Sequence, residues 1–85
     1  DVRIELGRHS VLCRARDFSM TGLFVEEAPA LPPEFPVRIP MPGVDLEVTA
    51  ICRVKRREGS GAALSFHEID WDDLLLLARR LAPRL

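Results

Sequence analysis

A polar segment from Asp17 to Gly22 contains the side chains that are best suited to binding a ligand. The Asp17 carboxylate can accept two hydrogen bonds, and its oxygens match the N1–H and N2–H donors of a guanine. Ser19 can both donate and accept a hydrogen bond, while Gly22 permits a positive φ or a close approach of a ligand to the backbone. Arg14 and Arg16 lie just before the segment and could supply positive charge or stack on a base.

The same segment also fits a turn that binds nothing. Side chains of Asp and Ser often accept hydrogen bonds from nearby backbone N–H groups, as in an Asx turn. The residue types of Asp17 and Ser19, taken alone, favour this interpretation and leave ligand binding as the alternative.

A basic run formed by Arg53, Lys55, Arg56 and Arg57 is a second candidate for binding an anion. The run ends a long alternating stretch and precedes a hairpin connection at residues 58–61. Basic residues at such a place are ordinarily solvated, so the pattern favours an exposed strand end over part of an anion site.

The remaining reactive side chains indicate neither catalysis nor a metal site. His9 and His67, the two histidines, have no spacing that would pair them with a nucleophile or a metal ligand. Cys13 and Cys52 form no CxxC or Cys/His pattern, and both fall on the inward phase of an alternating stretch. We therefore expect two buried, reduced thiols, no catalytic residue, no bound metal and no resident cofactor.

The elements that must position these side chains are short strands. Apolar and polar residues alternate with period two, as in Val2, Ile4 and Leu6 against Arg3 and Glu5. Prolines predict a loop over residues 28–36 and a turn over 40–43, and a further turn is expected at residues 8–10. The predicted strands cover residues 2–6, 11–16, 23–25, 37–39, 45–55 and 62–67. Six short strands with close turns favour a small barrel or sandwich.

The period changes to 3.6 after His67, which predicts a helix from Asp70 to Ala82. Asp70 is suited to cap the helix, and Pro83 ends it. Leu76 falls in the middle of the charged face and is the exception to the pattern. A helical wheel places one broad apolar stripe on Trp71, Leu74, Leu75, Leu77, Ala78, Leu81 and Ala82.

Length and composition limit the class of protein. Eighty-five residues with 47% hydrophobic and 29% charged residues indicate one globular domain, residues 1–85. A net charge of -1 argues against binding DNA or RNA, which requires a strong cationic field. The chain has neither a run of about 18 apolar residues nor a secretory signal, so we expect a cytoplasmic protein without a membrane span.

The pattern Asp17-x-Ser19-x-x-Gly22, followed by Leu23-Phe24-Val25, resembles the DxSxxG signature of PilZ domains. The proline loop, the Arg53-Val54 strand, the charged hairpin and the stretch from Gly61 to Phe66 also resemble that family, over nearly the whole chain. The resemblance implies a six-stranded antiparallel β-barrel with a C-terminal helix. It also implies a non-catalytic bacterial sensor of cyclic-di-GMP, in which Asp17, Ser19 and Gly22 hold a guanine and its ribose-phosphate.

One feature of the family is not found ahead of the first predicted strand, which begins at Val2. PilZ receptors carry an arginine pair, RxxxR, just before the first strand, and Arg3 and Arg8 do not have that spacing. Either the pair precedes Asp1, or this domain is a degenerate member that binds a protein partner or a companion domain instead. In the second case Leu76 and the proline loop are the expected contact surfaces.

Overall fold

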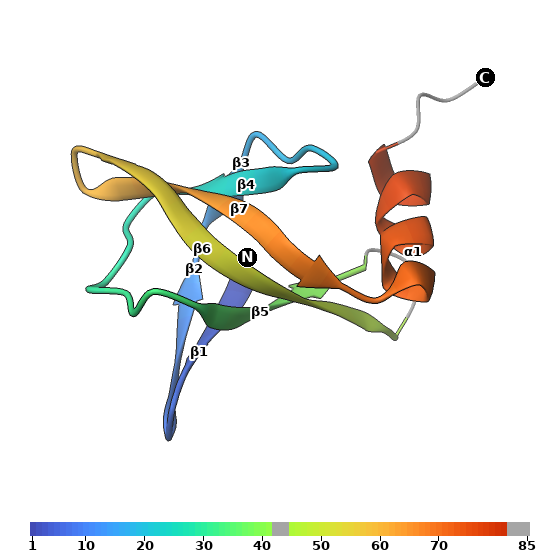
Figure 1. The fold of residues 1–85 in the computed structure, drawn as a ribbon, viewed down its shortest axis with the longest axis horizontal. Coiled ribbons are helices and arrows are strands. Elements are labelled where there is room, and N and C mark those ends of the chain that lie inside the picture. The colour runs from blue at the N-terminus through green and yellow to red at the C-terminus, as the bar shows by residue number, and fades with distance from the viewer. Residues whose placement is uncertain (42–44, 82–85) are drawn as a thin grey trace.

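The structure, a computed structural model, describes residues 1–41 and 45–81. It is an antiparallel, nearly closed barrel of seven strands with one helix (Figure 1). The strand order is β2-β1-β5-β6-β7-β4-β3. The elements are β1 (Val2–Leu6), β2 (His9–Cys13), β3 (Ala15–Arg16), β4 (Gly22–Val25), β5 (Phe35–Pro40), β6 (Glu47–Glu58), β7 (Gly61–Ile69) and α1 (Trp71–Leu81).

The chain crosses from one edge of the sheet to the other at position 14. Strands β2 and β3 occupy opposite edges of the sheet, yet Arg14 alone separates them in the chain. The sheet must therefore curve until its two edges come close together, which leaves less exposed edge than a flat open sheet would have. The predicted antiparallel barrel with a C-terminal helix is confirmed. It has seven strands instead of six, because the single strand predicted over residues 11–16 is divided where the chain leaves one edge at Cys13 and joins the other at Ala15.

Two tight hairpins begin with glycines in the left-handed region. Gly7 has φ 66° between β1 and β2, and Gly59 has φ 58° between β6 and β7. Glycine adopts this conformation without the steric cost that a Cβ adds. The hairpin between β6 and β7 lies at residues 58–61, as the sequence predicted. The turn between β1 and β2 was predicted to begin at residue 8 but begins at Gly7, since His9 already pairs with Leu6.

Strand β5 is longer than its prolines suggested. It begins at Phe35 and includes Pro36 and Pro40, although the sequence predicted a loop up to Pro36. The reason is burial. Every second residue of the strand points into the core, namely Phe35, Val37 and Ile39, and the strand pairs with β6. The predicted turn over 40–43 extends beyond the described residues at positions 42 and 43.

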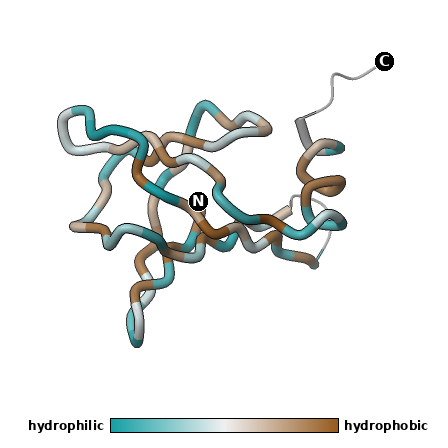
Figure 2. Tube along the Cα trace, viewed as in Figure 1, coloured by the Kyte–Doolittle hydropathy of each residue, from teal (hydrophilic) through white to brown (hydrophobic). Residues whose placement is uncertain are grey.

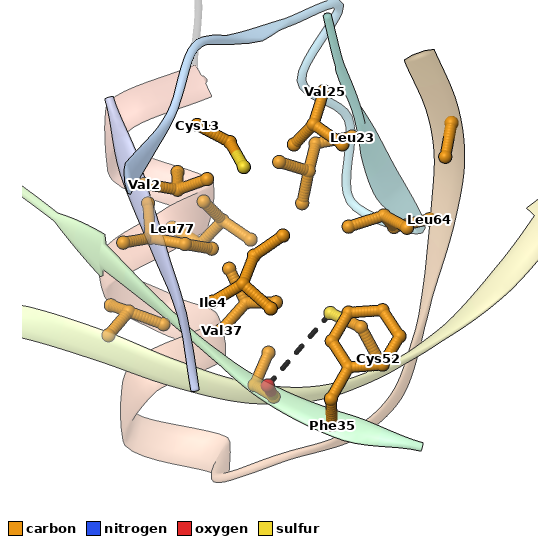
Figure 3. Packing of buried hydrophobic residues seen from close by; sticks show 14 of the residues in the cluster. Val2, Ile4, Cys13, Leu23, Val25, Phe35, Val37, Cys52, Leu64 and Leu77 are labelled. Atoms are coloured by element: carbon orange, nitrogen blue, oxygen red, sulfur yellow. Dashed lines mark hydrogen bonds between the residues drawn. The ribbon is translucent and has the colours of Figure 1, made fainter. Parts of the chain in front are cut away.

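The core consists of the inward-facing residues of the strands together with Met41 and Leu77 (Figure 3). Figure 2 shows the hydropathy of each residue along the chain. Cys13 and Cys52 are buried and free, as predicted. Burial raises the pKa of Cys52 to about 12, and it also raises the pKa of Cys13. The Cys52 thiol lies 3.9 Å from the carbonyl oxygen of Ala50, the contact drawn in Figure 3.

Two register shifts interrupt the pairing of β6 with β7. Val54 pairs with Leu64 but Arg56 pairs with Ala63, so Lys55 is the extra residue of a β-bulge on β6. In the same way His67 is the extra residue on β7. A bulge changes the phase of the strand that follows it, so Arg56 points outward instead of into the barrel.

Helix α1 stands at the end of the molecule opposite the β6–β7 turn and packs mainly against β6 (Figure 1). Leu77 is fully buried, and Leu76 also packs against the core cluster. The single apolar stripe predicted for the helix was therefore wrong in two respects. Trp71 is 71% exposed and Leu75 is 50% exposed, while Leu76 faces the barrel.

The start of the helix agrees with the sequence. The Asp70 carbonyl accepts a hydrogen bond from the Leu74 N–H at 2.8 Å, and the Asp73 carboxylate accepts one from the Thr49 N–H at 3.4 Å. The second bond ties α1 to β6. Within residues 1–41 and 45–81, no helix combines the length and the apolar character needed to cross a membrane.

Candidate functional site

The polar segment forms a loop between β3 and β4, and it begins with an unusual backbone conformation. Asp17 has φ 54°, a value that side-chain-bearing residues rarely adopt and that Asp tolerates better than most. Its carboxylate is 76% exposed and lies 3.5 Å from the Arg16 Nε. Asp17 thus carries an accessible acceptor pair whose one interaction among the described residues is with its neighbour.

Ser19 has a different role, because its side chain organises the loop. Its Oγ accepts a hydrogen bond from the Thr21 N–H at 3.2 Å and lies 3.0 Å from the Thr21 Oγ1. The Ser19 N–H donates to the Gly22 carbonyl at 2.9 Å. The turn interpretation therefore describes Ser19, whereas Asp17 makes no comparable bond to the backbone in the described part of the chain.

Gly22 is required for packing and not for a positive φ. It lies at the start of β4 opposite Ser65, outside the left-handed region. A Cβ at this position would collide with the carbonyl oxygen of Leu64 on β7. Of the two roles that the sequence left open for Gly22, the structure does not use the positive φ, and the left-handed residue of the segment is Asp17.

A row of side chains crosses the outer face of four strands next to this loop. Arg16 pairs with Phe24, Phe24 pairs with Ala63, and Ala63 pairs with Arg56. The Arg16 guanidinium lies 4.6 Å from the centroid of the Phe24 ring. Since Ala63 is small, it leaves space between the Phe24 ring and Arg56.

The loop and the row enclose an open hollow of about 510 Å³, a volume within the usual range for small-ligand sites. We call it the β3–β6 hollow. Asp17 and Ser19 lie on one side of it, and Lys55 and Arg56 lie on the other. Its lining residues are Arg16, Asp17, Ser19, Thr21, Gly22, Leu23, Phe24, Lys55, Arg56, Glu58, Ala63, Leu64 and Ser65.

Positive charge exceeds negative charge in the β3–β6 hollow. Arg16 is paired with Asp17, and the Arg56 guanidinium lies 3.2 Å from the Glu58 carboxylate. Lys55, the bulge residue, makes no ion pair within the described residues and is exposed. It therefore leaves one unbalanced cation beside the carboxylate and hydroxyl groups of the loop.

Arg14, which the sequence also proposed for the ligand site, lies elsewhere. Arg14 lines a separate hollow with Asp1, Glu26 and Glu27, so the structure does not bring it to the side chains of Asp17 and Ser19. Its carbonyl accepts a hydrogen bond from the Glu26 N–H at 2.9 Å. Arg14 and Arg16 are only two residues apart in the sequence, but Arg14 lies between β2 and β3 whereas Arg16 belongs to β3.

Only half of the basic run reaches the hollow. Arg53 donates to the Glu34 carboxylate and to the His67 ring at 3.0 Å, and Arg57 donates to the Ala28 and Pro29 carbonyls. The hydrogen bond from Arg53 lowers the pKa of Glu34. Sequence reasoning considered the run as a unit and did not include Phe24, Glu58 or Ala63, since only the strand pairing shows which residues share a face.

The described residues include no group of three or more His, Cys, Asp or Glu side chains arranged to hold a metal ion. A small antiparallel barrel with a polar, cationic hollow on its outer face has the features expected of a small-ligand-binding module. The family model of the PilZ domain matches residues 1–82, so the chain belongs to the PilZ domain family, a family of cyclic-di-GMP receptor domains. No curated protein matches the chain.

Proposed function

We propose that this domain is a cyclic-di-GMP receptor that binds the nucleotide in the β3–β6 hollow. The observation that carries the proposal is that Asp17, Ser19 and the cations Arg16, Lys55 and Arg56 line one hollow. Membership of a family of receptor domains supplies the identity of the ligand. Such a module senses the messenger in the bacterial cytoplasm and has no catalytic step of its own.

In this proposal Asp17 recognises the guanine base. Its exposed carboxylate accepts the N1–H and N2–H donors of one guanine edge, a charge-assisted pair of hydrogen bonds. The Arg16 guanidinium already stacks against Phe24, and its outward face offers a second plane against which a base stacks. Ser19 contributes mainly by holding the loop in shape, because its Oγ is engaged with Thr21.

The two phosphate charges of the ligand are held by cations on the opposite side of the hollow. Lys55 has no counter-charge among the described residues and therefore loses no ion pair when a phosphate approaches. Arg56 shares its charge with Glu58, so its contribution is smaller than that of Lys55. An arginine pair upstream of Asp1 would add further phosphate contacts, as the family pattern implies.

Isothermal titration of cyclic-di-GMP into the 85-residue chain tests this proposal with a matched pair of variants. Arg16→Ala removes an arginine that lines the hollow, whereas Arg14→Ala removes one that lies outside it. We expect Arg16→Ala to weaken binding about tenfold and Arg14→Ala to change it less than about twofold.

Asp17→Ala provides the second comparison. Loss of a charge-assisted pair costs about 1.5–3 kcal/mol, so the dissociation constant should rise about ten- to a hundredfold. Binding that survives both Asp17→Ala and Arg16→Ala unchanged would show that the nucleotide lies elsewhere. Failure of the chain to bind at ~1 mM, even when extended upstream to include an arginine pair, would reject a receptor role and support a protein-interaction module.

A further inference from the structure

Helix α1 has a second apolar face that points away from the barrel. Trp71 and Leu75 are largely exposed, and Ala78 follows them on the same side of the helix. Leu77 packs against the core on the other side, and Leu76, which is partly buried, packs against the core from the flank between the two faces. The spacing of four and then three residues between Trp71, Leu75 and Ala78 is that of a coiled-coil seam.

Opposite charges lie beside this seam, one near each end. Asp72 and Arg79 are seven residues apart, so they lie on the same side of α1, two turns from each other. With Leu75, Leu76 and Ala78 they line a mostly apolar hollow of about 590 Å³. Neither side chain forms an ion pair within the described residues.

This arrangement complements itself when a second helix runs in the opposite direction. Reversing the direction about a twofold axis near Leu75 places Asp72 of each helix against Arg79 of the other, which forms two ion pairs. A parallel pairing would instead place each charge against its own kind. Twofold symmetry requires a surface that matches itself, and the Asp72–Leu75–Arg79 arrangement meets this requirement.

We propose that two copies of this chain associate through the Trp71–Leu75–Ala78 face of α1, with the helices antiparallel. The apolar seam supplies the contact, and the Asp72–Arg79 pairs set the direction. The association requires no cyclic-di-GMP, because the β3–β6 hollow shares no lining residue with α1. A single helix of 11 residues offers a small interface, so the dimer belongs to the weak, transient class.

Sedimentation equilibrium without nucleotide, at chain concentrations up to ~1 mM, tests the proposal with two charge variants. Asp72→Lys leaves only cations beside the seam, and Arg79→Glu leaves only anions. We expect each variant alone to weaken self-association at least tenfold. Mixed together they should form a heterodimer, because each variant supplies the charge that the other lacks at both ion pairs. Thermal unfolding of each variant confirms that α1 is still folded.

Substitutions in the seam give a second test. Leu75→Ala should weaken the dimer about tenfold. Leu12→Ala should not change it, because Leu12 is even more exposed than Leu75 but lies on β2, three strands away from β6. Because Trp71 is the one tryptophan, its fluorescence should shift to the blue as the wild-type chain is concentrated. A wild-type chain that stays monomeric at ~1 mM would overturn the proposal. So would charge variants that do not restore association when mixed.

Discussion

The Arg16 guanidinium lies 4.6 Å from the centre of the Phe24 ring, its cross-strand neighbour on the outer face of the barrel. The ring in turn lies over Gly61, where a Cβ would be 2.5 Å from the Phe24 Cζ. Two glycines and one bulge therefore shape the same face. Gly22 lets β4 approach the Leu64 carbonyl on β7, and Gly61 leaves room for the Phe24 ring. The bulge at Lys55 turns Arg56 outward. The shape of this face therefore depends on backbone features more than on any single polar residue.

A double-mutant cycle on Arg16 and Phe24 should detect their contact. Phe24→Leu keeps an apolar side chain but removes the ring that the guanidinium faces. We expect a coupling free energy of about 0.5 kcal/mol in urea unfolding, the low end for cation–π pairs, since Arg16 is more than half exposed. Effects of Arg16→Ala and Phe24→Leu that add without coupling would show that the stacking makes no energetic contribution.

Gly22→Ala should destabilise the domain severely. The new methyl group meets the carbonyl oxygen of Leu64, a backbone atom in the middle of the sheet that cannot move without breaking strand pairing. We expect a loss of at least about 2 kcal/mol in the free energy of unfolding. Gly7→Ala is the control, because open space surrounds Gly7 and only its φ of 66° opposes the substitution, at about 1 kcal/mol.

The buried thiol of Cys52 predicts a loss of stability at alkaline pH. Its pKa is raised from 9.0 to about 12 in the folded chain, so above pH 9 the unfolded chain releases this proton more readily. The stabilisation is complete below pH 9 and is lost progressively as the pH rises towards 12. Cys52→Ala removes this titration and leaves a cavity whose cost is the same at every pH.

Urea unfolding of the wild type and of Cys52→Ala between pH 7 and 10.5 measures this effect. The difference in free energy between the two proteins should shrink by about 1 kcal/mol for each pH unit above 9. A difference that stays constant over the whole range would indicate that the Cys52 thiol is not shielded in the folded state.

Leu77 and Leu75 offer a matched test of the two faces of α1. Leu77 is fully buried against the barrel, so Leu77→Ala should cost about 2–4 kcal/mol of stability. Leu75 is half exposed, and Leu75→Ala in dilute solution should cost less than about 1 kcal/mol. Thermal unfolding below the concentration of self-association measures both, and the reverse ranking would mean that the helix docks through its other face.

The sequence predicted most strands because burial on one face imposes alternation, but it missed features that depend on partners distant in the chain. Alternation continues unbroken through Cys13, Arg14 and Ala15, so nothing local reveals that the chain changes edges there. The bulge at Lys55 exists only relative to the register of β7. The sequence proposed Asp17, Ser19 and Gly22 through the PilZ resemblance and Lys55 through the basic run, whereas Phe24 and Ala63 join them in the β3–β6 hollow only through strand pairing.

The affinity for cyclic-di-GMP should rise strongly when an arginine pair is present upstream of Asp1. The β3–β6 hollow provides one uncompensated cation, Lys55, for a ligand with two phosphate charges, so the 85-residue chain should bind weakly. An upstream arginine pair with the family spacing would add two charge-assisted contacts of about 1.5–3 kcal/mol each, which corresponds to about 10²- to 10⁴-fold in affinity. Titrations of the 85-residue chain and of a form extended upstream to include such a pair measure the difference.

The gain in affinity should disappear when both added arginines are replaced by glutamine. It should also fall with increasing salt because the contacts are ionic. Equal affinity of the two forms would show that the hollow alone determines binding, and that Lys55 and Arg56 neutralise the phosphates without help.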